Sequence, residues 1–238
     1  MGMTARRGVT DDAAVLQRAF AEEFTVRSAE SIARRGRFVV ALPGGSVATT
    51  FLPVLAGLTV DWAHIDLFWI DERAVPPDHP DSNYGIASRL LLRPAHVPPA
   101  RIHRMYGELP ELEQAARRAS DELKSVAGDP PRLDLALVGV GEDGHVASIF
   151  GGVSVGGRRA PVDPVIAVHD APKPPARRLT MTLPVLADAG IVVVAAFGAA
   201  KAEAMRDAIG ASVRTPVARL LRDARSSLVL LDREAGLS

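Results

Sequence analysis

One stretch of the chain, residues 134–150, constrains both fold and chemistry most strongly; it reads DLALVGVGEDGHVASIF. The apolar run at 133–138 has the length of a buried parallel strand. Gly139, Gly141 and Gly144 follow within six residues, so the backbone can turn tightly and approach a ligand. The turn ends on His145, which places an acid–base group at the carboxyl end of a strand, where open α/β sheets usually bind ligands. Residues 146–150 then resume an apolar pattern that predicts the start of a helix.

Composition narrows the class of protein further. The chain has 238 residues and 47% hydrophobic content, which favours one α/β domain over residues 1–238. Its 28 basic and 28 acidic residues give no net charge, so no basic field attracts nucleic acid or a membrane surface. The absence of cysteine excludes disulfides, thiolate zinc sites and cysteine nucleophiles. Without a membrane-length apolar run or the apolar core of a signal peptide, a cytoplasmic location is expected.

Strands and helices are expected to alternate along the chain. This alternation favours a three-layer α/β/α fold with a mainly parallel central sheet and helices on both faces. Strands are predicted at 37–42, 64–70, 101–106, 133–138, 165–168, 178–182, 191–197 and 227–231, and helices at 11–34, 47–55, 83–92, 109–126, 199–209 and 216–224.

The segment at 151–175 departs from this pattern, because it is rich in glycine and proline and has few large apolar residues. It is too short for a domain, so we expect a loop over the site or a surface insertion, with one short strand at 165–168. The pattern G-x-S-x-G occurs at 152–156. A nucleophile elbow requires a strand before it and a helix after it, so this match is expected to be accidental.

Four predicted strands end in glycine-rich or polar residues, at 44–46, 71–73, 141–145 and 198–201. The carboxyl ends of parallel strands share one edge of the sheet. A glycine turn at a helix N-terminus binds anions through free N–H groups and the helix dipole. Arg73 and Lys201 add the positive charge that a phosphate dianion needs. These features together predict a small phosphorylated substrate and proton-transfer chemistry.

Neither a dinucleotide nor a metal is expected at this edge. Residues 139–144 match G-x-G-x-x-G, but the helix, second strand and acidic residue of a dinucleotide fold do not follow. Asp143 would also place negative charge beside a pyrophosphate. The remaining histidines have no comparable context and no metal-ligand spacing, so they receive no role. They are His64, His79, His96, His103 and His169.

Four motifs in order resemble those of the 6-phosphogluconolactonase family, over roughly residues 37–232. Glucosamine-6-phosphate deaminases, also called isomerases, belong to the same superfamily. Two positions depart from the lactonase pattern: Val47 and Ala48 replace the usual Thr-Pro, and Gly151 replaces a proline. The motifs are PGGS at 43–46, IDER at 70–73 with DSN at 81–83, GVGEDGHVASIF at 139–150, and RLTMT at 178–182 with GAAK at 198–201.

The resemblance implies a Rossmann-like, sugar-phosphate isomerase-like fold that hydrolyses 6-phospho-D-glucono-1,5-lactone to 6-phosphogluconate in the pentose phosphate pathway, without metal or cofactor. His145 is expected to be the general base, oriented by Asp71 or, as the less favoured choice, by Asp143. Backbone N–H groups of the glycine turn are expected to bind the oxyanion, and Asn83 to contact the sugar. The residues expected to bind substrate and phosphate are Gly44, Gly45, Ser46, Arg73, Asn83, Gly141, Gly144, Arg178 and Lys201.

Two other functions stay open. Deaminases usually carry tyrosine where Arg73 stands, and a catalytic glutamate in an Asn-Glu-Pro run where this chain has Ser148, Ile149 and Phe150; both differences favour the lactonase. A non-catalytic sugar-phosphate sensor on the same fold is the second alternative. The expected partner is a small phosphosugar lactone rather than nucleic acid or a membrane, and the expected assembly is a monomer or a weak homo-oligomer.

Overall fold

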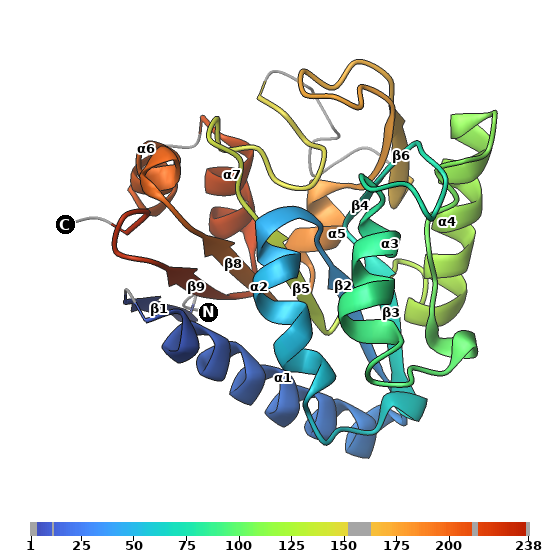
Figure 1. Cartoon of the computed structure of the whole chain (residues 1–238), viewed down its shortest axis with the longest axis horizontal. Helices are drawn as coiled ribbons and strands as arrows, with labels where there is room; N and C mark the ends of the chain where they lie inside the picture. Colours follow the sequence, from blue (N-terminus) through green and yellow to red (C-terminus); the bar gives the residue numbers. More distant parts are fainter. Residues whose placement is uncertain (1–3, 11, 152–162, 211–213, 237–238) are drawn as a thin grey trace.

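The architecture is built on a six-stranded sheet in which all neighbouring strands run parallel. The computed structural model describes residues 4–10, 12–151, 163–210 and 214–236, and its strand order is β1-β9-β8-β5-β2-β3. The predicted α/β fold with a mainly parallel central sheet is therefore confirmed (Figure 1). The strands are β1 (Thr4–Val9), β2 (Phe38–Leu42), β3 (Ile65–Trp69), β5 (Leu135–Gly139), β8 (Ile191–Ala196) and β9 (Ser226–Leu231).

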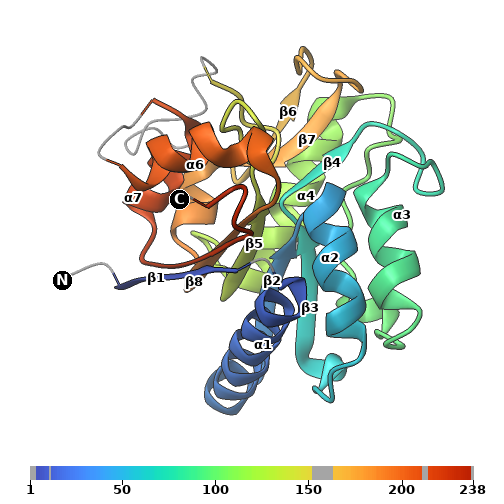
Figure 2. The same cartoon turned by 60° about the vertical axis from the view of Figure 1, so that its left-hand side comes forward.

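Helices cover both faces of this sheet and bury its side chains in two cores (Figure 2). Along β2, Phe38 and Val40 belong to the core of one face, whereas Val39 and Ala41 belong to the core of the other. Because both faces are buried, the strands read as apolar runs rather than as alternating patterns. The first face carries α1 (Ala13–Arg35), α2 (Gly45–Ala56) and α3 (Asn83–Ala87), and the second carries α4 (Leu112–Ala127), α5 (Leu183–Ala187), α6 (Ala202–Ile209) and α7 (Pro216–Asp223).

A second, antiparallel sheet adjoins the carboxyl edge of the first and was not predicted. Its order is β4-β7-β6, with β4 at Asp71–Arg73, β7 at Arg178–Met181 and β6 at Val165–Val168. We predicted 71–73 to be only the end of a strand, but the chain changes sheets at Ile70 and pairs Arg73 with Arg178. This crossover brings residues from two distant motifs beside the end of β3.

Two further differences separate the predicted elements from the observed ones. Strand β1 was missed because its sequence, TARRGV, is polar and it pairs only with β9 at the sheet edge. No strand forms at 101–106; η3 (Pro99–Arg101) precedes a single bridge between Ile102 and Leu67. The predicted strand at 165–168 is confirmed as β6. Residues 152–162 of the predicted loop, including the G-x-S-x-G pattern, lie outside the described residues.

His103, which received no role from its sequence context, ties the edge strand β3 to α4. Its Nε2 lies 3.0 Å from Oδ1 of Asp66, and its Nδ1 lies 2.9 Å from Oε1 of Glu122. The ring also stacks on Phe68 at a centroid distance of 4.5 Å. Burial alone would lower the pKa of His103, but the hydrogen bonds and charges of the two carboxylates outweigh burial and raise the pKa to about 8.

We therefore expect the free energy of unfolding to fall as pH rises through the pKa of His103. The stabilisation is fully present below the ordinary pKa of 6.5 and is lost above about 8, which amounts to about 2 kcal/mol. Urea unfolding of the wild type and of His103→Gln at about pH 6 and about pH 9 measures this loss. His169→Gln, which removes an exposed histidine beside Glu113, is the control. An equal pH dependence in His103→Gln and the wild type contradicts the prediction.

Candidate active site

A cavity of about 290 Å³ lies where the carboxyl ends of the parallel strands meet the small sheet. Four of its lining side chains are cationic, namely Arg73, Lys173, Arg178 and Lys201, and one is a carboxylate, Asp71. This excess of positive charge suits a small ligand that carries a dianion. The predicted site residues that line it are Gly44, Gly45, Ser46, Asp71, Arg73, Gly141, His145, Arg178 and Lys201.

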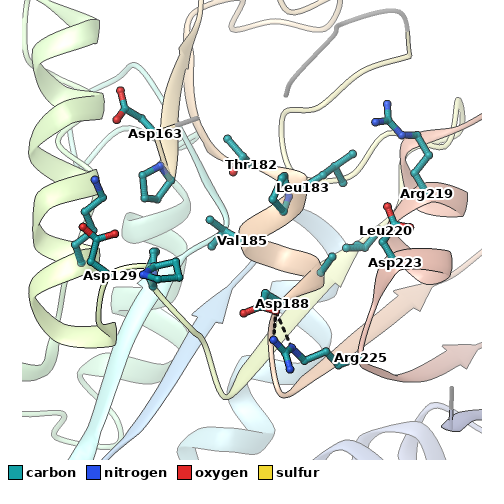
Figure 3. A pocket seen from close by; sticks show the side chains of 16 residues that line it. Asp129, Asp163, Thr182, Leu183, Val185, Asp188, Arg219, Leu220, Asp223 and Arg225 are labelled. Carbon is teal, nitrogen blue, oxygen red and sulfur yellow. Dashed lines mark hydrogen bonds and ion pairs between the residues drawn. The ribbon is translucent and has the colours of Figure 1, made fainter. Parts of the chain in front are cut away.

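A larger cavity, of about 770 Å³, lies between α4, α5 and α7 (Figure 3). Among the described residues, its lining includes none of the predicted site residues. Its charges include both signs, and Arg225 donates from Nε to Oδ1 of Asp188 at 2.7 Å within its wall. Without an imidazole or a glycine turn, this cavity is not where we place the chemistry.

The imidazole of His145 is held by Asp143 rather than by Asp71. Nδ1 of His145 lies 2.5 Å from Oδ1 of Asp143, while the ring centroid lies 4.6 Å from that of Phe150. Burial acts to raise the pKa of Asp143, but the hydrogen bond and charge of His145 outweigh it and lower that pKa. A carboxylate at Nδ1 favours the tautomer with the proton on Nδ1, which leaves the Nε2 lone pair to accept a proton.

The prediction that Asp71 orients His145 is therefore wrong in its choice of partner. The Asp71 side chain is 5% exposed and is bound from within the protein. Ser148 donates from Oγ to Oδ2 at 2.6 Å, and Asn83 donates from Nδ2 to Oδ1 at 3.0 Å. The physical reason is local. Asp143 lies only two residues from His145 across the glycine turn, whereas Asp71 lies on β4 and is held at the interface of β4 with α3 and residue 148.

Asn83 was predicted to contact the sugar, but it is fully buried behind the cavity wall. Its Nδ2 also donates to the carbonyl oxygen of Asp71 at 2.9 Å. A Cβ on Gly44 would lie 1.7 Å from Oδ1 of Asn83, so only glycine fits there. Asn83 thus sets the positions of Asp71 and of the loop that begins α2.

The N-terminus of α2 presents backbone N–H groups to the cavity. Gly44 is the N-cap residue and forms no side-chain cap, and Gly45 has a φ of +63°. The first N–H groups of an α-helix have no intrahelical partner and carry the positive end of the dipole. Gly45 and Ser46 are exposed and line the cavity, so this turn has the form of the predicted anion site.

The N–H groups of Gly141 and Gly144, in the glycine turn after β5, do not have the oxyanion-binding role predicted for the turn. Gly141 donates its N–H to the carbonyl oxygen of His145 at 2.9 Å, and Gly144 donates to that of Gly141 at 3.0 Å. Both groups are therefore already used and are not free for an oxyanion. Gly144 has a φ of +77° and packs against Thr215 outside the cavity lining, where a Cβ would lie 2.6 Å from that side chain.

The helix predicted to start at 146 is also absent; residues 146–149 form a tight turn. Val146 and Ile149 exchange backbone hydrogen bonds of 3.4 and 2.9 Å. Ala147, between them, has a φ of +51°, which is incompatible with an α-helix. Since Val146, Ile149 and Phe150 are buried, their apolar pattern reflects the core rather than one face of a helix.

Glycine is required at position 141 because the His145 ring occupies the space that a side chain at this position would need. A Cβ at this position would lie 1.9 Å from Nδ1 of His145. We expect Gly141→Ala to displace the imidazole and to lower kcat by about 10- to 100-fold, because misplacement by about 1 Å has effects of this order. Gly57→Ala is the matched control, since the nearest atom to its Cβ is 3.6 Å away. Steady-state rates equal to those of the control contradict this prediction.

Glu72, in the IDER motif, was not predicted to matter and organises the wall of the site. It is 3% exposed. Burial raises its pKa, against the opposing effect of three backbone N–H donors. Its carboxylate joins β4 to the start of α3, because it accepts hydrogen bonds from the N–H groups of Arg73, Asn83 and Tyr84 and from Oγ of Ser82. The signal for this role is a carboxylate followed ten residues later by a serine helix cap.

Features of this kind define a class of protein: an open α/β sheet with an imidazole–carboxylate pair and a cationic cavity at its carboxyl edge is typical of enzymes that act on small anions. Comparison with known proteins makes this specific. The chain belongs to the family of glucosamine-6-phosphate isomerases and 6-phosphogluconolactonases, whose family model matches residues 11–230.

Individual relatives agree with this assignment. The 6-phosphogluconolactonase of Synechocystis sp. is 35% identical over 223 residues, or 89% of each chain. A probable chloroplastic 6-phosphogluconolactonase of Oryza sativa subsp. indica is 38% identical over 202 residues, which are 78% of this chain but only 60% of that longer relative. The 6-phosphogluconolactonase structure from Trypanosoma brucei superposes with a TM-score of 0.83 at 26% identity and covers 98% of each chain.

Two absences hold for the described residues, 4–10, 12–151, 163–210 and 214–236. None of the helices in these parts is both long enough and apolar enough to cross a bilayer. Across the same residues, no group of three or more histidine, aspartate or glutamate side chains is arranged to hold a metal ion.

Proposed function

We propose that this protein is a 6-phosphogluconolactonase, which hydrolyses 6-phospho-D-glucono-1,5-lactone to 6-phosphogluconate in the pentose phosphate pathway. The observation that carries the proposal is the pairing of Asp143 with His145, which lines a cavity whose charged side chains are mostly cationic. A lactone is an activated ester, so its hydrolysis requires a base, an oriented water molecule and charge stabilisation. General acid–base catalysis contributes typically about 10²–10⁴-fold.

In the proposed mechanism, Nε2 of His145 removes a proton from water as the water oxygen attacks C1 of the lactone. The C1 carbonyl becomes a tetrahedral oxyanion, and the imidazolium is stabilised by the carboxylate of Asp143. Collapse of this intermediate re-forms the C1 carbonyl and breaks the bond to the ring oxygen. The protonated His145 then donates its proton to that oxygen, which leaves as the hydroxyl group of the product. No step of this scheme uses a metal, so activity is expected to survive dialysis against a chelator.

We assign phosphate binding to the N-terminus of α2 together with Arg73 and Lys201. Arg73 donates from Nη1 to the carbonyl oxygen of Asp81 at 2.8 Å, which anchors its guanidinium at the cavity wall. Nζ of Lys201 lies 3.8 Å from Oε1 of Glu142, in a pair weakened by the exposure of the Glu142 side chain. A dianion competes well with such a partner, because it also gains the N–H groups at Gly45 and Ser46.

The deaminase alternative is disfavoured because the cavity lacks a suitably placed free carboxylate among the described residues. Ring opening and isomerisation need a glutamate shortly after the histidine, yet this chain has Ser148, Ile149 and Phe150 there and no carboxylate. Asp71, the one carboxylate among the described lining residues, is already bound by Ser148 and Asn83. The sensor alternative does not require the Asp143–His145 pair, which is an arrangement suited to moving protons.

A pH-stat assay of acid release from freshly prepared phospholactone tests the proposal, after correction for the uncatalysed background. We expect release well above background. Ammonia release from glucosamine 6-phosphate would support the deaminase instead. Binding of 6-phosphogluconate in a calorimeter without any hydrolysis of the lactone would support the sensor.

A further inference from the structure

The guanidinium of Arg178 is enclosed by the backbone of the loop that precedes it. Nε donates to the carbonyl oxygen of Pro175 at 2.8 Å, and Nη2 donates to those of Lys173 and Pro174 at 2.8 and 3.3 Å. Nη1 donates to Oγ of Ser148 at 3.4 Å. These bonds use four of the five N–H donors of an arginine side chain.

Such a side chain is poorly placed to be a phosphate ligand. Arg178 is 4% exposed, and bidentate recognition of a phosphate needs two parallel N–H groups of the guanidinium. Only one N–H group remains after the bonds to residues 148 and 173–175. The phosphate-binding role predicted for Arg178 therefore does not fit its hydrogen bonds, although the residue lines the cavity.

The loop that encloses the Arg178 guanidinium brings a different cation to the cavity. The backbone N–H of Ala171 donates to the carbonyl oxygen of Ala176 at 3.0 Å, which closes the loop at its base. Lys173 and Pro174, near its tip, both line the cavity. Lys173 is exposed, and no ion pair links it to a carboxylate within the described residues. Lys173 was not predicted as a site residue, because it lies in the glycine- and proline-rich segment.

We propose that Lys173 is a substrate-binding residue whose ammonium contacts the phosphate of the phosphosugar, and that Arg178 is a positioning residue that holds the Lys173 loop at the cavity. This inference deepens the proposed function and rests on it. Arg178 acts through three carbonyl oxygens that a lysine cannot reach together, because an ammonium is a compact point donor whereas a guanidinium is a planar fork. Its bond to Ser148, which itself binds Asp71, also links the loop to the wall of the site.

A double-mutant cycle separates this role from direct binding. The variants are Lys173→Met, Arg178→Lys and the double variant, with the Kd of 6-phosphogluconate measured by calorimetry and kcat and KM measured with the lactone. We expect each single variant to raise Kd and KM by about 10-fold with kcat nearly unchanged. The Kd and KM of the double variant are expected to equal those of either single variant. Arg177→Lys is the matched control, since the side chain of this neighbouring arginine donates, among the described residues, to the carbonyl oxygen of Pro110 outside the cavity.

Two results would overturn the inference: an unchanged Kd in Lys173→Met, or effects that multiply in the double variant. The second would identify Arg178 as an independent ligand. Because Lys173 is exposed, its replacement is not expected to disturb folding. Lys173→Met and the charge-preserving Lys173→Arg therefore test the binding role of Lys173 even if thermal melting shows that Arg178→Lys does not fold. Wild-type protein that binds 6-phosphogluconate but does not hydrolyse the lactone would reject the proposed function alone, because the binding comparison remains valid.

Discussion

Replacing His145 by asparagine is expected to lower kcat by about 10²–10⁴-fold, the usual contribution of a general acid–base group. The Kd of 6-phosphogluconate is expected to change little, because the proposed phosphate ligands lie on α2, β4, η4 (Ala199–Lys201) and the Lys173 loop rather than on the glycine turn. Asparagine is smaller than histidine and its amide still reaches toward Asp143, so the turn keeps its shape. Rates from the pH-stat assay and Kd from calorimetry measure the two effects separately.

The matched control for this substitution is His64→Asn. His64 also pairs with an aspartate, since its Nδ1 lies 2.7 Å from Oδ2 of Asp61, but this pair is exposed and remote from the cavity. We expect its kcat to equal that of the wild type. Near-normal turnover in His145→Asn would show that the imidazole is not the base and would leave the hydrolase mechanism without its central group.

Asp143→Asn is expected to lower kcat by about 10²- to 10³-fold. The asparagine side chain is nearly isosteric, but it removes the negative charge that stabilises the imidazolium. Where its amide N–H₂ faces Nδ1 of His145, the proton moves to Nε2 and the base is lost, as in hydrolases whose orienting aspartate is replaced by asparagine. The wild type and the variant are compared by kcat over a range of pH.

Asp71→Asn provides the comparison that separates the two carboxylates. Asp71 is bound by Ser148 and Asn83, so we expect this variant to lose stability in thermal melting and to lose less kcat than Asp143→Asn. A larger loss of kcat in a folded Asp71→Asn would contradict the assignment of Asp143 as the partner of His145. That outcome would restore the partner favoured from sequence.

The difference between Asp71 and Asp143 shows which features of the site could be predicted from local sequence. The motif at 139–150 identified the histidine, the tight turn and the strand before it, because a short apolar run, glycines and an imidazole are each local signals. Both carboxylates follow predicted strands, and the closeness of Asp143 to His145 in sequence did not by itself decide between them. Their roles depend on Asn83 and Ser148, which approach Asp71 from 12 and 77 residues away.

The different surroundings of Arg178 and Lys173 were not predictable from sequence for the same reason. An arginine in a family motif suggests a ligand, and a lysine among prolines suggests an exposed loop. The pairing of β7 with β4 and β6 folds the loop back so that its own carbonyl groups satisfy the arginine. Hydrogen-bond satisfaction of a buried guanidinium is a property of the assembled loop and is invisible in residue type or spacing.

By itself, the sequence determined the parallel α/β class and the position of the glycine turn and His145 at the carboxyl edge of the sheet, because hydrophobic period and glycine content are properties of short stretches. Only the tertiary structure decided which carboxylate holds the imidazole, which N–H groups remain free and which cationic side chains line the cavity. Those choices follow from the small antiparallel sheet and from the burial of Asn83, since each buried polar group binds whichever partner the packed chain brings within reach.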